Sequence, residues 1–127
     1  SKMENEIPST SFSIEWVGKL EAYHSEEYVI RVECDSGGKV QVIVDKTIVI
    51  DWNSCFGNVD GHIVLTASKR LGIRVLYIHG DGNSFIRLKW SSPSERKFVI
   101  IPAECLYREV LVSKKSYSPE IFPNHVE

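Results

Sequence analysis

The chain has 127 residues, of which 25% are charged, and its 15 Lys and Arg against 17 Asp and Glu leave a net charge of −2. Acidic and basic residues are interspersed, which argues against a nucleic-acid-binding surface. No apolar run approaches the roughly 20 residues of a membrane-spanning helix, so we expect no membrane insertion of this segment and a single domain with its own core.

The first two predicted strands cover residues 12–18 and 27–34. In the second, Tyr28, Ile30 and Val32 alternate with polar residues, which is typical of a half-buried strand. The segment 35–38, Asp-Ser-Gly-Gly, predicts a turn, because glycine accepts positive φ and Asp and Ser cap turns through their own side chains.

The next pair of strands is predicted at residues 40–44 and 48–52, joined by a tight turn at Asp45-Lys46. Val40, Val42 and Val44 share one face of the first strand and lie opposite Gln41 and Asp45, so a hairpin is expected. Residues 57–61 and 80–83, which are rich in Gly, Asn and Asp, are predicted as loops.

Later strands are predicted at residues 72–78, 85–90, 97–101 and 110–112, with one helical turn from Pro102 to Tyr107. Many short strands separated by turn signals predict an all-β antiparallel β-sandwich, and a barrel is the alternative. We expect the sandwich to span residues 12–112, between a flexible N-terminal tail at 1–11 and a C-terminal tail at 113–127.

Three cysteines, Cys34, Cys55 and Cys105, lie at wide spacing without the C-x-x-C arrangement of zinc or dithiol sites. The favoured interpretation is three buried thiols, and one disulfide plus a free thiol is the alternative. Catalytic motifs such as G-x-S-x-G and H-E-x-x-H are absent, so no enzyme is predicted. A glycosidase-like carboxylate set of Glu15 with Glu26-Glu27 is disfavoured against solvated glutamates.

The three tryptophans have different expectations. Trp16 and Trp90 lie on strands at positions that the alternation assigns to a core face. Trp52 ends a predicted strand just before Asn53, where its indole face is able to stack on a ligand. Core packing is the favoured interpretation for Trp52, and stacking on a ligand is the alternative.

An ordered set of segments carries a family resemblance. The segments are Phe12-Ser13-Ile14-Glu15-Trp16-Val17-Gly18, Glu27-Tyr28-Val29-Ile30, Val42-Ile43-Val44-Asp45-Lys46, Val49-Ile50-Asp51-Trp52, Gly72-Ile73-Arg74-Val75-Leu76-Tyr77, Ile86-Arg87-Leu88-Lys89-Trp90 and Ile101-Pro102-Ala103-Glu104-Cys105-Leu106-Tyr107. This order resembles the PA-fourteen domain of anthrax protective antigen, a β-sandwich found in adhesins, glycosidases and toxins. The resemblance implies carbohydrate binding and favours an extracellular or cell-surface location. Only eleven residues precede Phe12, so a shortened version, or a trimmed one, is expected.

The resemblance also implies a ligand site in two loops. Lectin-like members hold calcium with two adjacent aspartates, where this chain has Asp35 and Ser36. The second loop offers His79, Asp81 and Asn83. Asp35, Asp81 and Asn83 are the metal ligands implied, although the replacement of one aspartate by Ser36 argues against calcium. An ordinary tight turn at 80–83 is the alternative to metal binding.

The function predicted on this basis is a non-catalytic, lectin-like carbohydrate-binding module of a larger protein. Its ligand is expected at loops on one end of the sandwich, through Asp35, Ser36, Trp52, His79, Asp81 and Asn83. The alternative is a protein-interaction or structural module that has lost the calcium and sugar site. In either case the partner is a glycan or a protein, and the domain is expected to be tethered to further domains.

Overall fold

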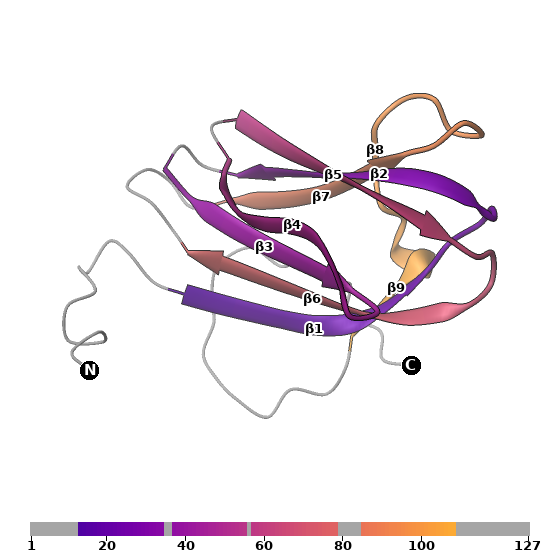
Figure 1. Ribbon diagram of the computed structural model, residues 1–127, viewed down its shortest axis with the longest axis horizontal. Coiled ribbons are helices and arrows are strands. Elements are labelled where there is room, and N and C mark those ends of the chain that lie inside the picture. Colours follow the sequence, from indigo (N-terminus) through magenta and orange to yellow (C-terminus); the bar gives the residue numbers. More distant parts are fainter. Residues whose placement is uncertain (1–12, 35–36, 56, 79–84, 109–127) are drawn as a thin grey trace.

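The computed structural model describes residues 13–34, 37–55, 57–78 and 85–108, which form two antiparallel sheets packed face to face (Figure 1). The strands are β1 (Ser13–Glu21), β2 (Glu26–Cys34), β3 (Lys39–Val44), β4 (Thr47–Ser54), β5 (Gly57–Leu65), β6 (Arg70–Ile78), β7 (Ile86–Ser91), β8 (Val99–Ile100) and β9 (Leu106–Arg108), with a 3-10 helix η1 (Ala103–Cys105) before β9. The predicted all-β antiparallel sandwich is confirmed.

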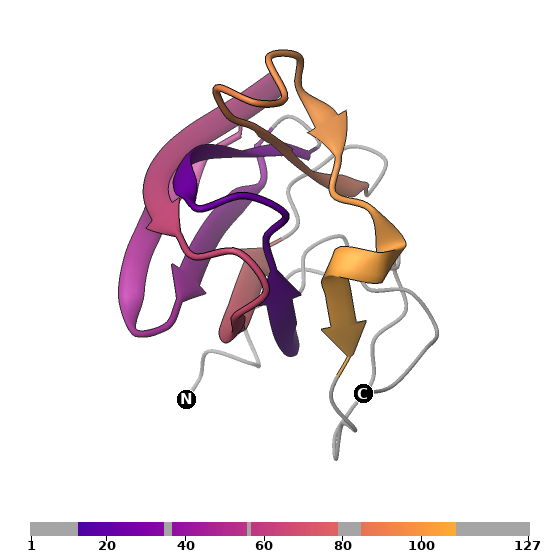
Figure 2. The same ribbon diagram turned by 90° about the vertical axis from the view of Figure 1, so that its right-hand side faces the viewer.

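One sheet has five strands in the order β4-β3-β6-β1-β9, and the other has four in the order β5-β2-β7-β8. Among the described strands, only β3–β4 and β7–β8 are chain neighbours that pair with each other. The remaining connections cross from one sheet to the other, as the segment from β8 through η1 to β9 does along one side of the sandwich (Figure 2). The sheets therefore bring together residues that are far apart in the sequence.

The core lies between the sheets and is built from alternate residues of each strand. In β2, Tyr28, Ile30 and Val32 are at most 1% exposed, while the residues between them reach solvent. Trp90 is 2% exposed and packs on Tyr28 with ring centroids 4.7 Å apart. Trp16 is also buried, so the core positions predicted for Trp16 and Trp90 are confirmed.

The predicted hairpin is present, but its second strand is irregular. Asp45 and Lys46 have φ of 49° and 71°, the two positive values that a two-residue hairpin turn of this hand requires. The register of β3 against β4 then shifts twice, between Val40 and Val42 and between Val42 and Ile43. Each shift inserts an extra residue into β4, which is a β-bulge.

The prediction of a loop at residues 57–61 is wrong, because these residues begin β5. β5 pairs with β2 along its whole length, with Gly61 opposite Ile30. Asn58 and Asp60 lie on the solvent side of the strand and therefore do not mark a turn. Gly61 has a packing role: a Cβ built on it would lie 2.1 Å from the carbonyl oxygen of Val49 in β4.

The C-terminal part also differs from the prediction. The helical turn ends at Cys105, and Leu106 begins β9, which pairs with Gly18–Leu20 of β1. The predicted strand at 110–112 and both predicted tails lie outside the described residues, so the domain boundaries stay predictions. Among the described residues, no helix is long and apolar enough to cross a membrane.

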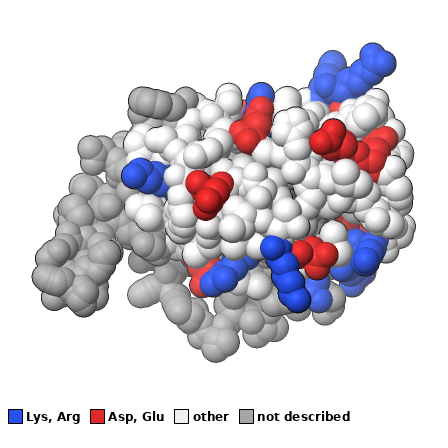
Figure 3. Space-filling model, in the orientation of Figure 1, with Lys and Arg blue, Asp and Glu red and all other residues white. Residues whose placement is uncertain are grey.

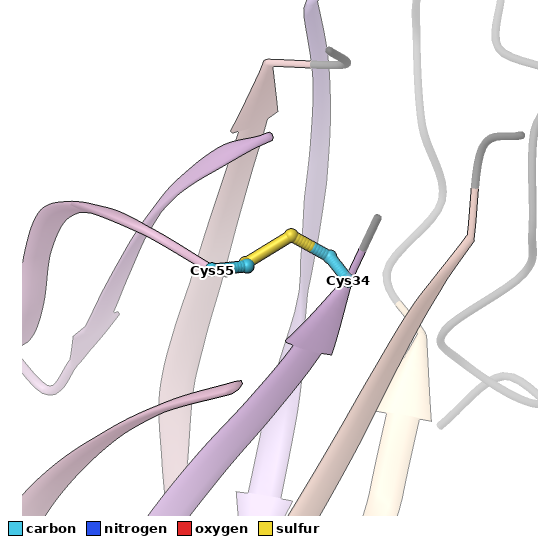
Figure 4. The surroundings of a disulfide bond; sticks show 2 residues. All are labelled: Cys34 and Cys55. Atoms are coloured by element: carbon cyan, nitrogen blue, oxygen red, sulfur yellow. A yellow bond between two sulfur atoms is a disulfide. The ribbon is translucent and has the colours of Figure 1, made fainter. Parts of the chain in front are cut away.

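A disulfide joins Cys34 and Cys55, and Cys105 is a buried free thiol (Figure 4). The favoured prediction of three thiols is therefore wrong. Cys34 ends β2 of the four-stranded sheet, while Cys55 follows β4 of the five-stranded sheet and donates its N–H to the carbonyl oxygen of Gly38 at 3.0 Å. The spacing of 21 residues does not predict this disulfide, because only the crossing of the chain between the two sheets brings the cysteines together.

We expect Gly61→Ala to lower the free energy of unfolding by about 3 kcal/mol, because backbone atoms of β4 must move to admit the methyl group. The matched control is Gly72→Ala, since a Cβ on Gly72 meets no atom within 4 Å, and its change should stay within about 0.5 kcal/mol. Urea denaturation of both variants measures the difference. Equal effects of the two substitutions would contradict the close approach of β5 to β4.

We expect replacement of both Cys34 and Cys55 by Ala to lower the free energy of unfolding by about 3 kcal/mol, because the disulfide restricts the unfolded chain. Urea denaturation without reductant measures this loss. Thiol titration of the denatured, unreduced wild type provides the control and should detect Cys105 alone. Detection of all three thiols in that sample would show that the disulfide is absent.

Candidate functional site

Trp52 lies at a bulge on the edge of the five-stranded sheet. Ile50 pairs with Val42 and Asn53 pairs with Val40, so Asp51 and Trp52 both face the single residue Gln41. Trp52 has φ of 51°, in the left-handed region that costs a residue with a side chain about 1–3 kcal/mol. Trp52 is 40% exposed, so the favoured interpretation of Trp52 as a core residue is wrong.

The surroundings of Trp52 hold this conformation in place. The amide nitrogen of Gln41 donates to the carboxylate of Asp51 at 2.9 Å, across the bulge. Three residues further on, Cys55 is fully buried and covalently linked to Cys34. A side-chain hydrogen bond thus spans the bulge, a disulfide lies three residues beyond Trp52, and the indole is exposed to solvent. We call the residues Gln41 and Asp51–Ser54 the bulge surface.

The stretch that carries the bulge surface is poor in charge. From Thr47 to Thr66 the sequence has two acidic residues and no lysine or arginine, whereas 25% of the whole chain is charged. Asp51 accepts from Gln41, and Asp60 is paired with Arg31. In the view of Figure 3, which matches Figure 1, the charged side chains are scattered and much of the middle of the face is uncharged. A largely neutral surface beside an exposed tryptophan is a common feature of binding sites.

Five of the six predicted ligand residues cannot be placed. Asp35, Ser36, His79, Asp81 and Asn83 all lie outside the described residues, so the ligand loops and the calcium site stay predictions. Within the described ranges, no three His, Cys, Asp or Glu side chains are grouped in a way that would hold a metal ion.

The glutamates considered as a carboxylate set are separated. Glu15 of β1 pairs with Arg74 at 2.6 Å in the five-stranded sheet. In the other sheet, Glu27 lies 3.7 Å from His62, and Glu26 accepts hydrogen bonds from the backbone N–H and hydroxyl of Ser94, each at 3.0 Å. These hydrogen bonds lower the pKa of Glu26, together with a hydrogen bond to Ser92, which is the largest cause. Each of the three glutamates has a local structural partner.

A second exposed aromatic residue, Tyr23, follows the C-terminal end of β1. Tyr23 donates its hydroxyl to the carboxylate of Glu104, and this hydrogen bond raises the pKa of Tyr23. Its ring lies 6.3 Å from that of Trp90. Burial raises the pKa of the nearby Cys105 thiol, which is thereby kept in its protonated form. These contacts connect η1 to the sandwich, and Tyr23 therefore has a structural role.

Several ion pairs lie on the outer face of the four-stranded sheet. Arg31 binds Asp60 through two hydrogen bonds of 2.7 and 2.9 Å, which lower the pKa of Asp60. Glu33 lies 2.9 Å from Lys89 and 3.3 Å from Arg87, and these hydrogen bonds, first that of Lys89, lower the pKa of Glu33. The charges on this face are satisfied within the domain.

The fold and this surface define a class: an antiparallel β-sandwich domain with a rigid, weakly charged edge that exposes one tryptophan. A protein-family model described as the PA14 domain matches residues 1–104. The chain belongs to the PA14 domain family, and the resemblance inferred from the sequence is confirmed.

The relatives of the chain are anti-sigma factor proteins. It is 31% identical over 107 residues to the anti-sigma-I factor RsgI3 of Acetivibrio thermocellus, a match that covers 82% of this chain and 16% of that protein. A solved anti-sigma factor domain-containing protein from Clostridium clariflavum is 33% identical with a TM-score of 0.68, over 82% of this chain and 35% of that one. A second solved protein of the same description is 27% identical with a TM-score of 0.71, over 82% and 36%. The chain thus spans about a sixth of the curated relative and about a third of the solved chains.

These relatives overturn the predicted function. The main hypothesis was a lectin-like carbohydrate-binding module, and similarity to anti-sigma factor proteins points to regulation and signal sensing instead. The alternative hypothesis, an interaction module, agrees better with these findings.

The sequence offered Trp52 as a candidate ligand residue but favoured a core position for it, so its exposure was not predicted. Simple alternation from Ile48 through Ile50 places Trp52 on the core side of β4. The two bulges in β4 break that alternation, and Val49, the extra residue of the first bulge, is the residue that Gly61 of β5 approaches closely. No local signal in residues 47–54 marks a bulge, because neither Gly nor Pro occurs there.

We expect Trp52→Gly to be more stable than Trp52→Ala by about 1 kcal/mol, because only glycine adopts a left-handed φ without strain. The control is the pair Ile48→Gly and Ile48→Ala in the same strand, since Ile48 is 53% exposed and is not among the positive-φ residues. There the order should be reversed, because glycine weakens an ordinary strand. Thermal and urea denaturation of the four variants measure both differences, and a more stable Trp52→Ala would refute the left-handed conformation.

Proposed function

We propose that this chain is a non-catalytic sensing module of an anti-sigma-factor-type regulatory protein, and that it takes a protein partner at the bulge surface. The observation that carries the proposal is Trp52, a half-exposed indole in a left-handed backbone conformation on an anchored edge. Strain of this kind persists only where the surrounding structure enforces it, and it is concentrated at functional sites.

The chemistry of the bulge surface favours a protein partner. The cores of protein interfaces are depleted of charged residues and enriched in aromatic ones, and tryptophan is prominent among residues that dominate binding energy. Trp52 is followed by the exposed and uncharged residues Asn53 and Ser54. The only described acid in the surface, Asp51, already accepts a hydrogen bond from Gln41.

A regulatory role is supported by the relatives and not by Trp52 alone. Proteins described as anti-sigma factors share this domain over 82% of the present chain at 31% and 33% identity. The domain makes up a minor part of each, so the sigma-factor-binding activity of such a protein need not reside in it. A module that detects a partner and passes the signal on fits this arrangement.

The disulfide supports a location outside the reducing cytosol. Disulfides such as Cys34–Cys55 form and persist in oxidising compartments. We therefore infer that the module lies outside the cytosol, where it meets external partners. The three glutamates considered as a catalytic carboxylate set do not support an enzyme, because Glu15, Glu26 and Glu27 each have a separate structural partner.

We expect Trp52→Gly, in the longer regulatory protein, to change the output of a sigma-factor-dependent reporter by about fivefold or more, since allosteric coupling between two sites commonly has this size. Glycine removes the indole and keeps the backbone conformation. The matched control is Val64→Ala, because Val64 is 71% exposed on β5 and lies outside the bulge surface. This control should leave the reporter unchanged.

Two further outcomes separate the parts of the proposal. If Trp52→Gly leaves the reporter unchanged while deletion of the whole domain alters it, the module senses through another surface. If deletion of the domain also has no effect, the sensing role itself is refuted. Circular dichroism of each variant chain confirms that the fold is retained.

A further inference from the structure

The Cys34–Cys55 disulfide lies next to the bulge surface and joins it to the other sheet. Cys34 is the last residue of β2 in the four-stranded sheet, and Cys55 follows the end of β4 in the five-stranded sheet (Figure 4). Trp52 lies three residues before Cys55. Because the third cysteine, Cys105, is a free thiol, no other disulfide connects the two sheets. A change at this bond therefore acts on the strand end that carries Trp52.

The other bonds of the bulge surface stay within its own sheet. Asn53 and Ser54 pair with β3, and Gln41 of β3 donates a hydrogen bond to Asp51. Cys55 donates its N–H to the residue just before β3. Within the described parts of the chain, none of these hydrogen bonds and strand pairings reaches the four-stranded sheet. The disulfide is thus the bond that ties this end of β4 to β2.

The backbone at Trp52 is held in an unfavourable conformation. Its φ of 51° lies in the left-handed region, and its side chain is largely exposed, so side-chain packing does little to enforce this conformation. Strained conformations persist only where the surrounding structure imposes them. A bulge bends the strand that contains it, and the bend at Trp52 comes just before the chain reaches Cys55. Of the bonds around Trp52, the covalent one is the strongest constraint on this bend.

Both cysteines are buried, so breaking their bond has a steric consequence. Cys34 is 2% exposed and Cys55 is 0% exposed. Two thiols occupy more space than two bonded sulfur atoms, and a close-packed core has little free volume for the difference. Cys34 is fixed by pairing with Gly57 of β5 on one side and Ile86 of β7 on the other, whereas Cys55 lies outside any strand. On reduction, the end of β4 is therefore the part that moves.

We propose that the Cys34–Cys55 disulfide is a redox switch for the bulge surface. In the oxidised chain the bond holds the end of β4, and Trp52 is presented in its left-handed conformation. In the reduced chain this strand end is released, Trp52 relaxes to an extended conformation, and the bulge surface no longer fits its partner. The inference rests on the proposed function in that the bulge surface is the partner site.

The switching reaction is thiol–disulfide exchange with a dithiol, for example dithiothreitol. A thiolate of the dithiol attacks one sulfur, and its second thiol resolves the mixed disulfide. The bond between Cys34 and Cys55 is replaced by two S–H groups while the dithiol closes to a cyclic disulfide, so two electrons and two protons pass to the protein. Because both cysteines are buried, the reagent attacks only when the end of β4 opens locally. Oxidation outside the reducing cytosol completes the bulge surface.

Nuclear magnetic resonance of the oxidised and the reduced chain tests the switch without a partner. Backbone coupling constants of Trp52, which report φ, should change from left-handed to extended values on reduction. The indole signals of the buried Trp16 and Trp90 should stay in place, and Trp52→Gly identifies the third indole signal by its loss. An unchanged φ at Trp52 would overturn the proposal. Loss of the folded spectrum on reduction would overturn it as well, because the disulfide would then stabilise the whole sandwich.

A pair of substitutions tests the link between the strain and the disulfide. Trp52→Gly and Trp52→Ala both remove the indole, but only glycine adopts a left-handed φ without strain. In the same dithiothreitol buffer, the ratio of oxidised to reduced chain should be higher for Trp52→Gly than for Trp52→Ala by about fivefold or more. Alkylation and mass spectrometry distinguish the two forms, because only Cys105 is a free thiol in the oxidised chain.

The matched control is the pair Ile48→Gly and Ile48→Ala, at an exposed position of β4 that is not among the positive-φ residues. Their two ratios should be equal, because the start of β4 does not change on reduction. Equal ratios for the two Trp52 variants would refute the switch, and so would unequal ratios for the Ile48 variants, since reduction would then disturb all of β4. The reporter response of Trp52→Gly enters none of these measurements, so failure of the switch is distinguishable from failure of the proposed function.

Discussion

The contact between β4 and β5 is the constraint on which the rest of the structure depends. These strands are edges of different sheets, and β5 approaches β4 so closely that Gly61 has no room for a side chain against the carbonyl of Val49. The Cys34–Cys55 disulfide joins the same two sheets beside this contact. One side of the sandwich is thus closed by a close backbone approach and a covalent bond.

The irregular edge follows from this closure. β4 must pair with β3 in its own sheet and also admit β5 from the other one, and it meets both demands with two bulges. Bulges re-aim side chains, and here the second of them presents the indole of Trp52 to solvent. The strain at Trp52 is tolerated because the disulfide and the Gln41–Asp51 hydrogen bond hold the strand on either side.

Both outer faces of the sandwich carry ion pairs that form within the domain. The four-stranded sheet has pairs such as Arg31–Asp60 beside the exposed Val64 and Ile100. The five-stranded sheet has pairs such as Arg74–Glu15 and carries Trp52 on its edge strand β4.

The sequence by itself determined the fold class, the hairpin at Asp45-Lys46, the core positions of Trp16 and Trp90 and the family, because alternation and turn chemistry are local and the family match rests on many positions at once. It did not reveal that residues 57–61 form a strand, because Gly61 and its neighbours resemble turn residues in the sequence. Gly61 is needed there because its backbone lies against the carbonyl of Val49 in the other sheet. The partnership of Cys34 with Cys55 and the exposure of Trp52 were likewise decided only by the tertiary structure. Both depend on where β5 crosses β4, a contact between sheets that no local pattern of residues encodes.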